Sequence, residues 1–311
     1  MAPQSYAGVR VVLAEPTAEM GAIINTALFP RGLRAFATCR DADGLCTALE
    51  EEPADVLMCD IDLAGLDFRT TMQRIRHKEI GANPFLHIVA MVSLSGRDQI
   101  QRLIGAGVDD LIRKPMTPVR LASRFDAMVR PRKPFVVAEE YVGPNRRKAL
   151  RRGDGYRFID VPNSLRSKTV DHVHASQIQR AVVYAWREVV ERQAGFKQEA
   201  INTLTARILS HYDVGGSEEN LRRDLGYLVA KAETIIERHR DSDTAHVAEI
   251  AACMVGVARR ILQSPTSPRR KDLRLMPHLS TAARKSAVAP DEAIDTVVEI
   301  TLLIRNYLGS L

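Results

Sequence analysis

The sequence has few cysteines and few aromatic residues, and it contains no long apolar run. Its 311 residues include four cysteines and one tryptophan. The cysteines show no CxxC spacing, so we expect neither a disulfide nor a zinc site at Cys39, Cys46, Cys59 or Cys253. No window approaches the roughly eighteen uninterrupted apolar residues of a membrane span, and the first residues do not resemble a signal peptide. These absences predict a cytoplasmic protein that does not enter a membrane.

The composition is that of an ordinary folded chain. Hydrophobic residues make up 45% and charged residues 26%, and the length is sufficient for two cores. The formal net charge of +6 favours association with an acidic partner but carries no information about the fold. Local patterns divide the chain into a domain over 8–130, a basic linker over 131–169 and a helical domain over 170–311.

Short apolar runs alternate with amphipathic segments in the first domain. The runs are rich in aliphatic and β-branched residues, as expected for buried parallel strands, and they cover 9–14, 33–39, 55–59, 87–92 and 110–112. The segments between and after them have the length of helices, at 17–29, 41–52, 68–77, 97–104 and 118–128. This alternation predicts an α/β fold, a doubly wound parallel sheet of five strands.

The linker is basic and has no sustained period. It is rich in arginine and lysine and contains several prolines and glycines. We interpret it as a solvated tether or as a surface for an anionic partner. Its apolar residues Phe135, Val136, Val137 and Tyr141 are candidates for docking onto a neighbouring domain.

The C-terminal domain has a helical pattern throughout. Apolar residues recur at three- and four-residue steps within 217–240, 247–262 and 294–308. Breaks at Gly195, 215–216, 241–242 and 264–268 predict about six helices in an all-α bundle.

Polar residues follow four of the predicted strands, at the edge where open parallel sheets bind ligands. The first strand is followed by Glu15, the third ends at Asp60, and the fourth and fifth are followed by Ser93 and Lys114. Two neighbouring carboxylates are costly unless a cation lies between them, and Mg²⁺ prefers such oxygen ligands. A hydroxyl and a lysine nearby could contact a phosphoryl group, so the set predicts phosphoryl transfer to a carboxylate.

This constellation resembles the receiver domain of two-component response regulators, which has a flavodoxin-like fold. The resemblance covers about residues 8–130. It implies that Asp60 is the phosphoacceptor, that Ser93 turns onto the phosphoryl group, and that Lys114 pairs with its charge. It also implies Mg²⁺ held by Glu15, Asp60 and the backbone carbonyl of Asp62, and a cis peptide bond before Pro115.

Two positions depart from the pattern of that family. Pro16 stands where the second acid of the pair is expected, which implies weaker Mg²⁺ binding. Glu15 itself could reach the metal, and Glu19 is a less favoured substitute. Leu111 replaces the aromatic residue that many members have three positions before the lysine. A domain that no longer accepts phosphate therefore stays open as an alternative.

The helical domain faintly resembles a histidine phosphotransfer bundle that has lost its histidine. His239 and His246 lie near a predicted break, and neither begins a His-x-x-Lys-Gly pattern. The nearest match to a helix-turn-helix, at 283–300, has an acidic and strongly apolar second helix, which argues against contact with nucleic acid. No Walker loop or GxGxxG motif is present, so we expect no enzymatic output.

The sequence therefore predicts a response regulator. Asp60 would receive phosphate from a histidine kinase or a phosphotransfer protein. The helical domain would signal through contacts with a downstream protein, by forming a homodimer or by sequestering a partner. The alternatives are an unphosphorylated scaffold with a receiver fold and a transcription factor with an unrecognised helical DNA-binding output.

Overall fold

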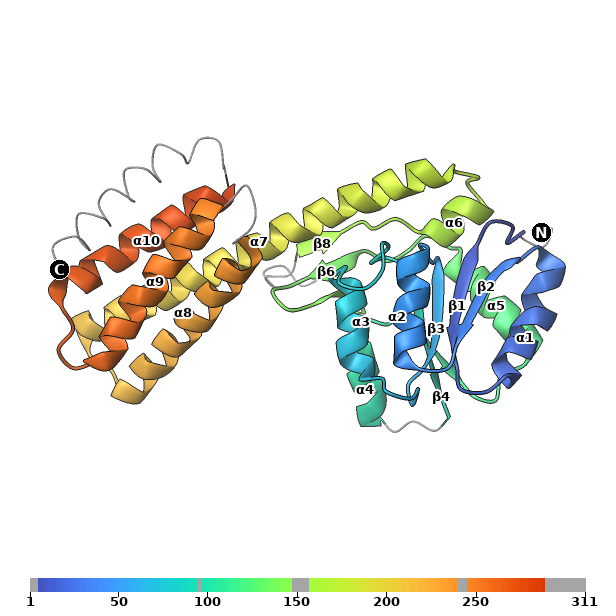
Figure 1. Ribbon diagram of the computed structural model, residues 1–311, viewed down its shortest axis with the longest axis horizontal. Coiled ribbons are helices and arrows are strands. Elements are labelled where there is room, and N and C mark those ends of the chain that lie inside the picture. The colour runs from blue at the N-terminus through green and yellow to red at the C-terminus, as the bar shows by residue number, and fades with distance from the viewer. Residues whose placement is uncertain (1–4, 94–96, 147–156, 240–244, 289–311) are drawn as a thin grey trace. The chain divides into compact units, whose positions relative to one another are not determined.

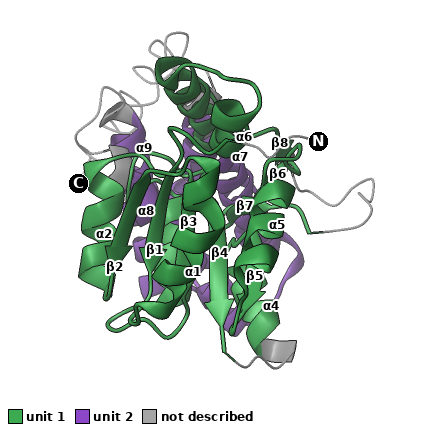
Figure 2. Cartoon of the chain, turned by 90° about the vertical axis from the view of Figure 1, so that its right-hand side faces the viewer, with its two compact units in different colours: residues 1–192 green, residues 193–311 purple. Residues whose placement is uncertain are grey.

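The computed structural model describes residues 5–93, 97–146, 157–239 and 245–288. The chain divides into two compact units, Met1–Arg192 and Gln193–Leu311, which Figure 2 colours separately. The division falls inside helix α7 (Ala175–Val214). The two compact units divide at residue 192, which differs from the domain boundaries predicted at 130 and 169. Those domain boundaries stay predictions. Each unit is described below by itself.

The first unit is built on a five-stranded parallel sheet with strand order β2-β1-β3-β4-β5. The strands are β1 (Arg10–Ala14), β2 (Ala35–Cys39), β3 (Val56–Asp60), β4 (His87–Val92) and β5 (Asp110–Arg113). Every residue of β1, β3 and β4 is buried, which explains why their sequences read as continuous apolar runs. The predicted α/β fold is confirmed, with strand order reversing between β1 and β3.

Helices cover both faces of this sheet, as Figure 1 shows. They are α1 (Glu19–Leu28), α2 (Ala42–Glu51), α3 (Phe68–Arg76), α4 (Arg97–Gly105) and α5 (Pro118–Met128), with a short 3-10 turn, η1 (Phe29–Arg31), after α1. Apolar side chains of α1 and α5 share one core with the sheet, and those of α2, α3 and α4 share the other. Side-chain caps begin three of these helices, from Asp41, Asp67 and Thr117.

A small antiparallel sheet follows the five-stranded one. It contains β6 (Phe135–Val137), β7 (Val142–Pro144) and β8 (Arg157–Ile159) in the order β7-β6-β8, and a short helix, α6 (Ser164–Thr169), comes next. We call the described residues 131–146 and 157–169 the extension. Leu165 of α6 is fully buried within the same core as α1 and α5. The extension is therefore packed onto the large sheet's own core.

The extension differs from the tether that its composition predicts. Phe135 and Val137 are fully buried, and Val136 and Tyr141 are half-buried, so the docking expected of these apolar residues is observed. The close approach of β7 requires a glycine at position 107, where φ is +85° and a Cβ would lie 3.1 Å from the carbonyl oxygen of Val142. Many of the basic residues that suggested a solvated segment instead bind carbonyls and carboxylates.

The second unit is helical. It contains the last part of α7, together with α8 (Glu218–His239), α9 (Ala245–Gln263) and α10 (Arg270–Val288), around a main apolar core and a smaller one between α8 and α9. The predicted break at Gly195 is wrong, because α7 continues through it. One glycine costs a helix only about 1 kcal/mol, which packing on either side outweighs. The helix expected over 294–308 lies outside the described residues. Within the described part, no helix has the length and apolarity needed to cross a membrane.

Candidate functional site

Three predicted residues meet at the edge of the sheet where the strands end. Asp60 is the last residue of β3, Glu15 follows β1, and Lys114 follows β5. Because β1 and β3 are neighbours in register, with Ala14 opposite Cys59, the two acids emerge side by side. The strand order of the sheet therefore assembles residues that are far apart in the sequence.

The ammonium group of Lys114 joins the two carboxylates. Its Nζ donates to Oδ2 of Asp60 and lies 3.3 Å from both carboxylate oxygens of Glu15. The acid side chains are 6% and 1% exposed, so these charges are largely removed from water. Burial works against the charged lysine, but the hydrogen bond and the charges of Asp60 and Glu15 outweigh it and raise the pKa of Lys114.

The second oxygen of Asp60 is held by the backbone. Oδ1 accepts a hydrogen bond of 2.9 Å from the backbone N–H of Asp62. The side chain of Asp62 is itself exposed, so its observed contact with Asp60 is made by its main chain. Asp60 thus has a fixed orientation at the surface end of a buried strand.

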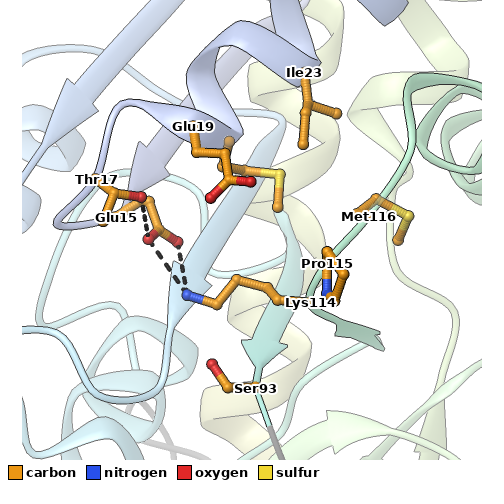
Figure 3. A pocket seen from close by; sticks show the side chains of 9 residues that line it. Glu15, Thr17, Glu19, Ile23, Ser93, Lys114, Pro115 and Met116 are labelled. Atoms are coloured by element: carbon orange, nitrogen blue, oxygen red, sulfur yellow. Dashed lines mark hydrogen bonds and ion pairs between the residues drawn. The ribbon is translucent and has the colours of Figure 1, made fainter.

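A cavity of about 350 Å³ opens beside Lys114, and Figure 3 shows the side chains that line it. Ser93, Glu15, Lys114 and Pro115 line this cavity together with Thr17 and Glu19. Ser93 is exposed. The cavity gives a ligand access to the lysine that contacts Asp60.

Thr17 is a site residue that the sequence did not indicate. Its hydroxyl donates to Oε1 of Glu15 at 3.1 Å and fixes that carboxylate from the side away from Lys114. A hydroxyl three residues after the end of β1, close to the predicted acidic site, is the signal in the sequence that could have indicated it.

The donor chemistry of this edge fits a magnesium ion. Mg²⁺ keeps several waters and commonly uses one or two carboxylates, and Glu15 and Asp60 supply two. With Lys114 between them, the three groups carry a net charge of −1, which favours a further cation. No group of three acidic, histidine or cysteine side chains is placed to bind a metal in the described part of the chain, so the ion would depend on few side-chain ligands. Pro16 explains this small number.

Two other predicted features are present at this edge. The peptide bond between Lys114 and Pro115 is cis. Leu111, at the position where an aromatic residue is common, is half-buried against the core formed with α2, α3 and α4.

Comparison with known proteins identifies the first domain. Residues 11–126 match the family described as response regulator receiver domain. Residues 11–126 are a response regulator receiver domain. The site at Asp60 and Lys114 lies within this receiver, while the match ends before the extension and the helical unit.

Two curated proteins are similar to the receiver. The sensor histidine kinase GacS of Pseudomonas protegens is 30% identical over 102 residues, which are 32% of this chain and 11% of the kinase. The transcriptional regulatory protein GltR of Pseudomonas aeruginosa is 29% identical over 126 residues, which are 40% of this chain and 50% of that protein. The chain therefore spans half or less of the length of these curated relatives.

Solved structures are similar over a comparable share of the chain. A response regulator from Thermotoga maritima is 21% identical, with 38% of this chain and 95% of that chain covered and a TM-score of 0.34. The receiver domain of the sensor histidine kinase PA1611 from Pseudomonas aeruginosa, solved with a magnesium ion in its active site cleft, is 23% identical. That match covers 38% of this chain and 97% of the other, with a TM-score of 0.33.

Proposed function

We propose that this protein is a response regulator whose receiver accepts a phosphoryl group on Asp60. The observation that carries the proposal is the contact of Lys114 with both Asp60 and Glu15 at the carboxyl edge of the sheet. A buried carboxylate that is fixed by a lysine and a backbone N–H is oriented as a nucleophile, and the lysine remains available to meet incoming negative charge.

The chemistry follows from this geometry. An oxygen of Asp60 forms a bond to phosphorus while the bond from phosphorus to the donor atom breaks, and the electron pair leaves with the donor. The product is an acyl phosphate. Lys114 moves its charge from the carboxylates toward the phosphoryl oxygens, and Ser93, on the same cavity, supplies a hydroxyl to one of them. A bound Mg²⁺, held by Glu15, Asp60 and the carbonyl of Asp62, would neutralise part of the phosphoryl charge.

The proposed partners are those that the family suggests. The phosphoryl donor is a histidine kinase or a phosphotransfer protein in the cytoplasm. The helical unit signals by binding a downstream protein or a second copy of this chain, and we propose no enzymatic activity for it. Phosphate must favour one packing of the receiver over another for such a signal to pass.

The experiment is to incubate the whole protein with Mg²⁺ and a small-molecule phosphodonor and to measure its intact mass. We expect an increase of about 80 Da, the mass of one phosphoryl group. Asp60→Asn should abolish the increase. Asp62→Asn is the matched control, since that acid is exposed two residues away and its backbone groups remain; it should keep most of the labelling.

A second candidate is an unphosphorylated receiver that serves as a binding scaffold, and Pro16 favours it. The residue at this position can supply no carboxylate, and Lys114 already contacts both acids that remain. In that case the mass would stay unchanged in wild type and in both variants, under conditions that label an ordinary receiver.

A further inference from the structure

A second cavity lies in the first unit at the edge of the sheet opposite Asp60. It has a volume of about 280 Å³. His87 and Asp110, which line it, are the first residues of β4 and β5, whereas Asp60 is the last residue of β3. Because the strands are parallel, their beginnings lie at the edge away from the phosphoryl site. The extension forms the other wall through Arg132, Pro144 and neighbouring residues.

Positive charge exceeds negative charge around this cavity. Its lining includes two aspartates, Asp109 and Asp110, and five basic residues, which are Arg124, Arg130, Arg132, Lys133 and Arg146. Both acids already have cationic partners. Asp109 binds Arg132 at 2.5 Å and Arg76 at 2.6 Å, and Asp110 binds Arg124 at 3.2 Å. The carboxylates therefore do not neutralise the remaining cations.

Three basic side chains of the lining have no acidic partner among the described residues. Arg130 and Lys133 are exposed and make no side-chain hydrogen bond or ion pair within that part of the chain. Arg146 donates only to backbone carbonyl oxygens, those of Val108 and Asp109. Three cations that converge on one cavity without a counter-charge repel one another, and an anion between them would relieve that repulsion.

Two buried polar atoms of the lining residues also lack partners. The Nε–H of Arg132 has no hydrogen-bond acceptor, and Nδ1 of His87 has no hydrogen-bond partner, in the part of the chain that the structure describes. The other ring nitrogen of His87 lies 3.1 Å from Oδ1 of Asn163 and donates to it, so Nδ1 is left as an acceptor. Leaving a buried polar group without a hydrogen-bond partner destabilises the fold. Both atoms belong to residues that line the cavity, but each atom is itself buried, so the exposed cations are the groups that a ligand in the cavity can reach.

We propose that this cavity binds a small phosphate-bearing anion, either a phosphate monoester or phosphate itself. The phosphate oxygens would contact Arg130, Lys133 and Arg146, the three cations that have no acidic partner in the described part of the chain. The volume is close to the lower end of known ligand pockets and excludes a large ligand. Since the walls come from both the sheet and the extension, the ligand would hold the extension against the receiver.

The test is isothermal titration calorimetry on the whole protein, in buffer with a metal chelator and no phosphate. The probes are inorganic phosphate, adenosine monophosphate and adenosine. We expect one phosphate or one monophosphate per chain and no binding of adenosine. Equal affinity for the two anions would identify free phosphate as a sufficient ligand, whereas tighter binding of the nucleotide would identify an ester.

A pair of variants locates the site. Arg130→Gln with Lys133→Gln should weaken anion binding at least about tenfold. Arg40→Gln with Arg120→Gln removes the same charge from two other exposed positions of the unit and should change the affinity less than about twofold. All four residues are exposed, so both variants should keep the fold, which circular dichroism checks. The proposal is overturned if neither anion binds at roughly 10 mM, if adenosine binds equally, or if both variants lose the same affinity.

Discussion

A nitrogen of the Arg132 guanidinium lies 2.5 Å from Oδ1 of Asp109, which ties the extension to the receiver through a buried ion pair. The side chains are 5% and 9% exposed. Arg76 binds the other oxygen of Asp109, and both guanidinium groups lie over the ring of Phe135, at 5.1 and 4.6 Å. Burial alone would raise the pKa of Asp109, but the charges of Arg132 and Arg76 lower it, so this acid stays ionised in the fold.

Removal of Arg132 should destabilise the first unit. Arg132→Met deletes a buried partner of Asp109 and leaves that carboxylate with Arg76 alone, which should lower the free energy of unfolding by about 3 kcal/mol. Urea unfolding followed by the fluorescence of Trp186, the one tryptophan of the sequence, reports on this unit. Arg130→Met is the control, because that side chain is exposed and should matter by less than about 0.5 kcal/mol. Equal effects would show that the ion pair contributes little.

Helix α6 should behave as part of the receiver core. Leu165 is fully buried, so Leu165→Ala should cost about 2–4 kcal/mol in the same Trp186 measurement. Val170, directly after the helix, is 38% exposed, and Val170→Ala should cost less than about 1 kcal/mol. A loss below 1 kcal/mol for Leu165→Ala would mean that α6 does not contribute to this core.

His87 should make the first unit less stable in acid. Burial, reinforced by the charge of Arg132, lowers the pKa of His87 from 6.5 to about 4 in the folded state. The unfolded chain therefore takes up a proton near pH 6.5 that the folded chain refuses until about pH 4. The stability that neutral His87 contributes is fully present above pH 6.5 and is lost as the pH falls from 6.5 toward about 4. The total loss should be about 3 kcal/mol.

The measurement for His87 is the free energy of unfolding at several pH values between 7 and 4, in wild type and in His87→Gln. The variant should lose less stability than wild type over this interval, because its amide does not titrate. His174→Gln, which removes an exposed histidine of the same unit, should keep the wild-type pH dependence. Parallel curves for wild type and His87→Gln would contradict the prediction.

The sheet and the meeting of Lys114 with Asp60 and Glu15 could be predicted because their signals are local. Strands β3 and β4 contain four and five consecutive apolar residues, and Asp60, Ser93 and Lys114 stand at or just after the strand ends. The extension could not be predicted in the same way. Its strands are three residues long, too short to show a period, and its basic residues resemble those of a solvated linker.

Contacts between residues that are far apart in the sequence were also not predicted. Arg76 lies on an amphipathic helix and gave no sign of complete burial, since its partner Asp109 is 33 residues away. Gly195 was a misleading signal because the effect of a glycine on a helix is local. Glycine lowers helix propensity locally, but buried residues such as Val189 and Ile201 stabilise α7 on both sides of Gly195. The sequence thus indicated which polar residues meet at the strand ends better than it indicated which charges hold the fold together.

Glu15 should be the main side-chain ligand besides Asp60 if Mg²⁺ binds at the carboxyl edge. Its carboxylate is buried and held by Thr17 and Lys114, whereas Glu19 lines the same cavity from an exposed position. Glu15→Gln should therefore weaken Mg²⁺ binding at least about tenfold, and Glu19→Gln less than about threefold, in calorimetric titrations. A larger loss for Glu19→Gln would mean that this residue supplies the carboxylate that Pro16 cannot. If wild type binds no Mg²⁺ at millimolar concentration, the ammonium of Lys114 is the only cation that the two carboxylates need.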